Sequence, residues 1–135
     1  MPDVYNGIFK DAQKYIKANS KYNPFIYKDT PQEQNKFPLV IIKQIDDPLY
    51  DENLDKTDQR FDLVYEIEIY TIDKENIARQ LITEELAKLV NDMFDIKYGF
   101  TRKTNKPVPN IDLNVDRRHM RFEAKIDENN IIYRR

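Results

Sequence analysis

Residues 61–71 read FDLVYEIEIYT, and this stretch carries the clearest structural signal in the chain. Apolar side chains occupy every second position, as they do in a β-strand that buries one of its two faces. The buried face would hold Phe61, Leu63, Tyr65, Ile67 and Ile69. Three acidic residues, Asp62, Glu66 and Glu68, fall on the other face. We therefore predict a strand with one face in the core and the other largely exposed to solvent.

The chain that follows this strand has the pattern of a long amphipathic helix over residues 75–94. Its apolar residues recur at intervals of three and four, which is the spacing of one helix face. Asp73 precedes the pattern and could cap the helix, because its carboxylate can accept hydrogen bonds from free backbone N–H groups. Gly99 follows the pattern and could take the positive φ of a helix end. The expected apolar face consists of Ala78, Leu81, Ile82, Leu86, Leu89, Val90 and Met93.

Shorter signals place the remaining elements. An amphipathic pattern predicts a helix over residues 3–18, and residues 25–27 favour a short extended piece. Two prolines interrupt residues 100–114, so this segment is expected to be a loop or a weakly paired edge strand. Further strands are predicted over residues 37–45, 115–126 and 131–133, the last two joined as a hairpin.

These elements predict an α+β fold: an antiparallel sheet of about four strands, with the N-terminal helix and one long helix packed on one face. The length of 135 residues suits a single domain, residues 1–135, with one core. No apolar run approaches the roughly 20 residues that span a bilayer, so we expect a cytoplasmic protein without membrane contact. The absence of Cys removes zinc-thiolate sites, Cys nucleophiles and disulfides.

The charged residues are unevenly distributed, although the net charge is only −2. Residues 46–58 carry six acids against one lysine, a net charge of −5, whereas residues 97–106 carry four basic residues and no acid. The overall charge argues against a protein whose main task is to grip nucleic acid. The two poles suit a subunit that meets copies of itself head to tail, while two solvated loops are the simpler alternative.

Few residues are arranged for catalysis. His119 is the only histidine, and the alternation places it on a polar strand face between Arg117 and Arg121. We interpret it as a solvated or interface side chain, because a general base needs an orienting partner and a cleft. Ser20 is the only serine and falls at a helix end, so a Ser-His-Asp arrangement is discarded. We predict a protein that is not an enzyme and needs no cofactor.

One enzymatic alternative stays open. Glu66 and Glu68 point the same way from one strand and could hold Mg²⁺ as in a metal-dependent nuclease. The site would need a further carboxylate, from Asp46, Asp47 or Asp58. A solvated strand face explains both glutamates without a metal, and no metal site is predicted.

Four sequence segments (the strings below) occur in a fixed order between Phe37 and Arg135. They are FPLVIIKQIDD (37–47), LVYEIEIYTID (63–73) leading into the long helix, GFTRKTNKPVPNIDLNVDRRHMRFEAKID (99–127) and IYRR (132–135). In this order they resemble the tail terminator, or tail completion, proteins of tailed bacteriophages and prophages of low-GC Gram-positive bacteria. The most telling part is GFTR with PVPN and the arginine-bearing strand behind it.

The resemblance implies a small α+β subunit of a hexameric ring at the tail-neck junction of the virion, assembled in the host cytoplasm. The ring would cap the tail tube, stop its polymerisation and offer the surface that joins the head. Its partners would be further copies of the chain, the tail tube protein and neck or connector proteins. DNA would pass through the lumen without specific binding. Another neck or head-tail connector protein is the neighbouring alternative.

A ring requires each subunit to offer one surface and to receive a different one, and opposite charges can fix that polarity. We therefore expect the acidic segment of one subunit to lie near basic residues of the next. The candidate interface residues are Asp46, Asp47, Asp51, Asp55, Asp58, Arg102, Lys103, Arg117 and Arg118.

Overall fold

A computed structural model describes residues 4–29, 31, 36–45, 60–74, 76–109, 112–127 and 132–133 of the chain. The fold is α+β, as the sequence pattern predicts. Its elements are α1 (Val4–Asn19), β1 (Phe25–Tyr27), β2 (Leu39–Ile45), β3 (Arg60–Thr71), α2 (Arg79–Asn91), a π-helical continuation η2 (Asp92–Lys97), β4 (Thr101–Pro107), β5 (Asp116–Asp127) and β6 (Ile132–Tyr133).

The strands form one sheet in the spatial order β1-β2-β3-β5-β4, and β6 pairs with β5 beyond the end of β4. The two longest strands, β3 and β5, pair over their whole length and form the centre of the sheet. The predicted hairpin of β5 and β6 is confirmed. Among the described residues the sheet has six strands rather than about four, and β1 runs parallel to β2, so it is not purely antiparallel. The count of about four omits β1, for which the sequence predicts only a short extended piece, and β4, for which both a loop and an edge strand stay open.

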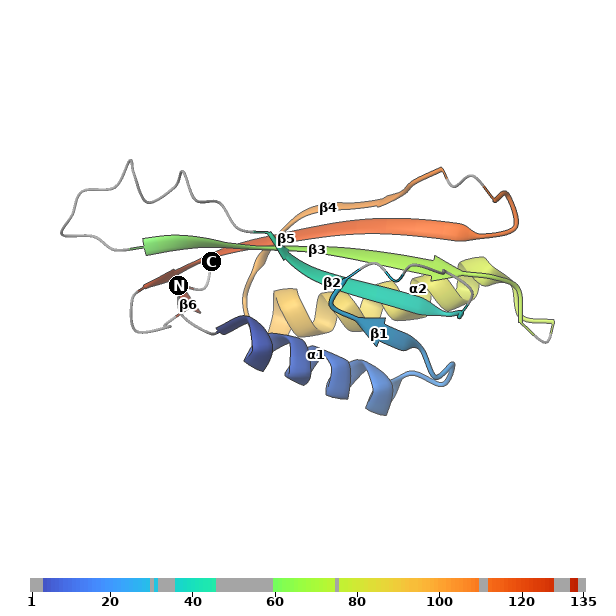
Figure 1. Cartoon of the computed structure of the whole chain (residues 1–135), viewed down its shortest axis with the longest axis horizontal. Helices are drawn as coiled ribbons and strands as arrows, with labels where there is room; N and C mark the ends of the chain where they lie inside the picture. The colour runs from blue at the N-terminus through green and yellow to red at the C-terminus, as the bar shows by residue number, and fades with distance from the viewer. Residues whose placement is uncertain are drawn as a thin grey trace.

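Both helices lie on the same side of the sheet, as expected (Figure 1). The core forms between them and the inner face of the sheet, where Leu63, Tyr65, Ile67 and Ile69 of β3 are fully buried. The Tyr65 ring lies 5.2 Å from that of Phe94 and 5.8 Å from that of Phe100, and Phe122 stacks on Phe94 at 5.3 Å. The predicted burial of this strand face is therefore confirmed at these four positions.

The long helix begins later than the sequence pattern indicates. Asn76 has a φ of 69°, and the backbone groups of Lys74 and Ile77 bond to each other, so this segment forms a turn and α2 starts at Arg79. The N-cap residue is therefore Ala78 and not Asp73 as predicted, although the Asp73 carboxylate still accepts a hydrogen bond from the free Arg79 N–H at 2.9 Å. The later start leaves Ala78 exposed, and Leu81 is 63% exposed, so neither belongs to the buried face.

The end of the helix agrees with prediction. Gly99 has a φ of 74°, and the Phe100 N–H donates to the Phe94 carbonyl across the turn. This turn delivers the chain into β4, which resolves the choice between a loop and an edge strand in favour of the edge strand. The acidic segment 46–58 lies outside the described residues.

Candidate functional site

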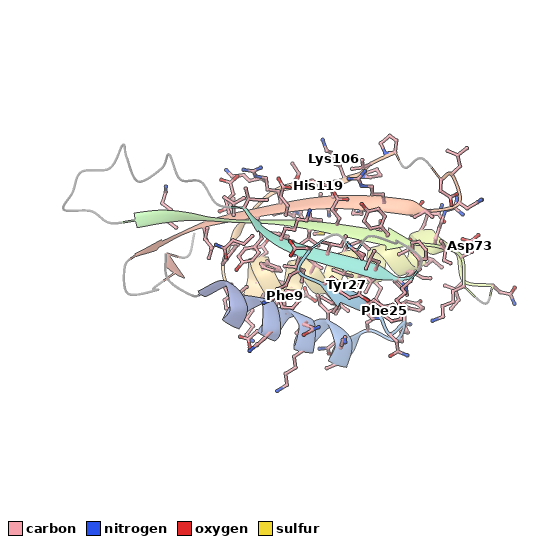
Figure 2. The ribbon with its side chains drawn as sticks, in the orientation of Figure 1. Phe9, Phe25, Tyr27, Asp73, Lys106 and His119 are labelled. Atoms are coloured by element: carbon pink, nitrogen blue, oxygen red, sulfur yellow. The ribbon has the colours of Figure 1, made fainter. Side chains whose placement is uncertain are left out.

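The sheet face opposite the helices is the most distinctive surface of the described chain, and we call it the open face. Cross-strand partners in a sheet share a face, so the register defines its rows. Figure 2 shows His119 and Lys106 on this side of the sheet, away from α1. The rows are Lys43-Glu66-Arg121-Thr104, Ile41-Glu68-His119-Lys106 and Leu39-Tyr70-Arg117, each running from β2 through β3 to β5 and, in the first two, to β4.

Glu68 is the centre of a polar network on the open face. Its carboxylate accepts hydrogen bonds from Arg117 Nε and Nη2 at 2.5 and 2.8 Å and from the Tyr70 hydroxyl at 2.9 Å. His119 Nδ1 lies 3.3 Å from the same carboxylate. Burial alone would raise the pKa of the Glu68 carboxyl, but the bonds from Arg117, Tyr70 and His119 outweigh it, so this pKa lies below its ordinary value of 4.5.

A second ion-pair group adjoins the first. Arg121 donates from Nη1 to Glu66 at 3.2 Å and from Nε to Glu123 at 3.0 Å, so one guanidinium joins two carboxylates. The arginines and glutamates of the open face therefore neutralise one another within the subunit. This arrangement stabilises the sheet surface and leaves these carboxylates engaged.

Glu66 and Glu68 are thus less exposed than the sequence pattern predicted. The exposed fractions of their side chains are 31% and 19%, because arginines of β5 cover them. The nuclease alternative requires carboxylates that are free to bind Mg²⁺, whereas both are paired with arginine. Within the described part of the chain no three His, Asp or Glu side chains gather as a metal site. The further ligands considered, Asp46, Asp47 and Asp58, lie outside it.

His119 has an orienting partner in Glu68, which the sequence alone could not indicate. Its side chain is partly buried between its strand neighbours, not fully solvated. His119 does not line the cavity of about 180 Å³ that lies where β4 ends and β5 begins. Its lining includes Pro107, Val108, Pro109, Leu113, Arg117 and Arg118.

An apolar patch continues the open face where β2 begins. Leu39, Ile41 and Tyr70 are buried there, and Tyr27, Phe37 and Val115 pack against them. Arg117 lies over the Tyr70 ring, with its guanidinium carbon 5.6 Å from the ring centroid. The open face therefore combines paired charges with a small apolar cluster.

The predicted basic interface residues do not form one surface. Arg117 is on the open face, while Arg118, its neighbour along β5, is on the helix side and donates to Glu84 at 2.6 Å and to Asn105 at 3.1 Å. Arg102 donates to Asn91 at 3.0 Å, and Lys103 is exposed at an irregularity in the β4 pairing. All three arginines therefore have partners within the chain.

The predicted acidic interface residues cannot be placed in the same way. Asp46, Asp47, Asp51, Asp55 and Asp58 lie outside the described residues.

The sequence interpretation overlooked a second basic surface. It used only the apolar side of the N-terminal helix, whereas the opposite side of α1 exposes Lys10, Lys14 and Lys17. The spacing of these lysines is readable in the sequence and could have identified this surface.

No helix in the described part of the chain is long and apolar enough to cross a membrane. A scan against protein-family models and a search of curated proteins found no match to the chain.

Proposed function

We propose that the chain is a structural subunit that forms a hexameric ring, caps a phage or tailocin tail tube and offers the surface that joins the head. The proposal starts from the resemblance of residues 37–135 to tail terminator proteins. It includes no catalytic role and no cofactor. Its partners are other copies of the chain, the tail tube protein and a neck or connector protein at the tail-neck junction, with DNA passing through the lumen.

The observation that supports the proposal most directly is the placement of the resembling strings. They correspond to β2, β3, β4, β5 and β6, which are neighbours in one sheet. The resemblance therefore covers a continuous folded unit rather than strings scattered over the molecule. An α+β subunit is also what the resemblance implies.

The charge pairing on the open face is compatible with a surface that does not bind DNA. Its arginines are already bonded to Glu66, Glu68 and Glu123, so phosphate groups would have to displace carboxylates in order to bind them. A surface of this kind suits a ring through which DNA moves without being gripped. A neck or connector protein would also form a ring, but it would bind a different partner.

Tube growth in vitro tests the proposal. Tail tube protein from the same particle is polymerised with the chain, and tube lengths are measured by electron microscopy. We expect shorter tubes with a ring at one end, and no shortening by an equal amount of heat-unfolded chain. Tubes as long as those grown without the chain would contradict the terminator function. Binding to the head connector instead of the tube would favour the neck-protein alternative.

A further inference from the structure

One side of α1 carries a row of lysines, Lys10, Lys14, Lys17 and Lys21, which we call the lysine row. The intervals of four, three and four residues place the first three on one helix face, and Lys21 follows just past the end of the helix. All four are exposed. The opposite side of the helix is buried in the core through Ile8, Phe9, Ala12 and Ile16.

The lysine row differs from the arginines of the open face because it is not neutralised. No carboxylate in the described residues forms an ion pair with Lys10, Lys14 or Lys17. The one acid on this part of α1, Asp11, accepts a hydrogen bond from the Tyr98 hydroxyl at 2.5 Å. Glu85 adjoins the other end of the row, where its carboxylate accepts a hydrogen bond from the Lys21 N–H at 3.2 Å. Four lysines against these two acids leave a local net charge of +2.

Like charges four residues apart on a helix repel each other. Lys10 and Lys14 are such a pair, and this repulsion is relieved when an acidic partner lies along the row. The chain itself contains a segment of opposite charge, since residues 46–58 have a net charge of −5 and carry Leu49, Tyr50 and Leu54 among their acids. That segment is outside the described residues and enters the argument only through its sequence.

We propose that the lysine row of α1 is the docking surface for the acidic segment Asp46–Asp58 of a second copy of the chain. The inference rests on the proposed function and deepens it, because it names the contact that joins one ring subunit to the next. The contact is head to tail: each copy offers an acidic segment and receives one on a different surface. It replaces the predicted basic partners Arg102, Lys103, Arg117 and Arg118, of which the three arginines are already bonded within their own subunit.

Charge reversal tests the contact. The variant Lys10→Glu, Lys14→Glu, Lys17→Glu is compared with a control of equal charge change on the edge strand, Arg102→Glu, Lys103→Glu, Lys106→Glu. Exposed ion pairs each change an equilibrium by about two- to fivefold, so the first variant should weaken association about tenfold to a hundredfold at low salt, and less at high salt. Native mass spectrometry against protein concentration gives the association constants.

Compensation identifies the partner. Adding Asp51→Lys, Asp55→Lys and Asp58→Lys to the lysine-reversed chain should restore association. Mixing the two singly reversed chains should yield assemblies in which the two chains alternate, because both contacts between unlike chains pair opposite charges, whereas contacts between identical chains pair like charges. Equal weakening by the lysine-row variant and by the edge-strand control would overturn the proposal, and so would a failure of the aspartate reversals to restore association. If the lysine-row variant lost binding to duplex DNA while its self-association stayed unchanged, the proposal would also be overturned, and the lysine row would be assigned to nucleic-acid binding.

Cross-linking separates this inference from the tail function. The chain has no cysteine, so Lys14→Cys in one chain and Asp55→Cys in another introduce one thiol each. On mixing and oxidation we expect a disulfide-linked dimer, which a Lys103→Cys chain should not form. Tube capping without this cross-link would overturn the inference and leave the proposed function standing. The cross-link without tube capping would support the contact and contradict the function.

Discussion

At the scale of single residues, Glu68 carries the most consequential set of contacts. It gathers an arginine, a tyrosine and a histidine from two strands around one carboxylate that is only 19% exposed. The lowered pKa of this carboxyl means that the folded state favours its charged form. Folding stability must therefore depend on pH through this group.

The direction of that dependence follows from the two pKa values. In the unfolded chain the carboxyl has its ordinary pKa of 4.5, and in the folded chain the pKa is lower. The stabilisation is therefore fully present above pH 4.5 and is lost as the pH falls through the folded value. We predict that Glu68→Gln lowers the free energy of unfolding by about 1 to 3 kcal/mol at about pH 7, and by less in acid.

Urea titrations of both proteins across this pH range measure the difference. Glu84→Gln is the matched control, because Glu84 also pairs with an arginine but is 65% exposed. Its substitution should cost about 1 kcal/mol or less. A difference for Glu68→Gln that stays constant from neutral pH down to about pH 3 would show that the charge of Glu68 does not stabilise the fold.

The sequence could not predict these contacts, although it contains every residue involved. Alternation placed Glu66 and Glu68 on the correct face of β3. Which arginines cover them depends on the register between β3 and β5, strands about fifty residues apart, and local patterns do not encode that register. Hence the face was predicted and its burial was not.

At the scale of elements, prediction succeeded where a periodic signal was long. β3 and β5 were located to within a residue or so, and α1 to within one residue at each end. The start of α2 was four residues too early, since the helical pattern runs through a turn in which Asn76 adopts a positive φ. A single asparagine among polar residues carries too little signal to mark that turn.

The hydrogen bond between Asp73 and the start of α2 gives a prediction at this scale. Asp73 accepts from the first N–H of the helix across the intervening turn, so Asp73→Ala should lower the free energy of unfolding by about 1 kcal/mol. Asp73→Asn retains an oxygen acceptor and should recover most of this loss. Thermal and urea unfolding of the two variants make the comparison. If both cost the same, the contribution of Asp73 is its charge beside Arg79 rather than its hydrogen bond.

At the scale of the whole molecule, the fold consists of a helix layer and a sheet whose outer surfaces differ in charge. The helices and the inner face of the sheet enclose the core (Figure 1). The outer surfaces differ in charge: arginines and glutamates pair on the open face, whereas Lys10, Lys14 and Lys17 of α1 form no ion pair with a carboxylate of the described residues. The sequence predicted the layers and an uneven distribution of charge. It did not locate the lysine row as a surface, because the basic segment near residues 97–106 has the higher local density of charge.

The most direct test of the central claim is to image particles made without the chain. Its gene is deleted from the phage or tailocin that encodes it, and tail length and head attachment are measured by electron microscopy, with the gene restored as the control. The account predicts overlong tails that lack heads. Tails of normal length without heads would point to a neck protein instead. Complete particles with normal tails and attached heads would contradict the account.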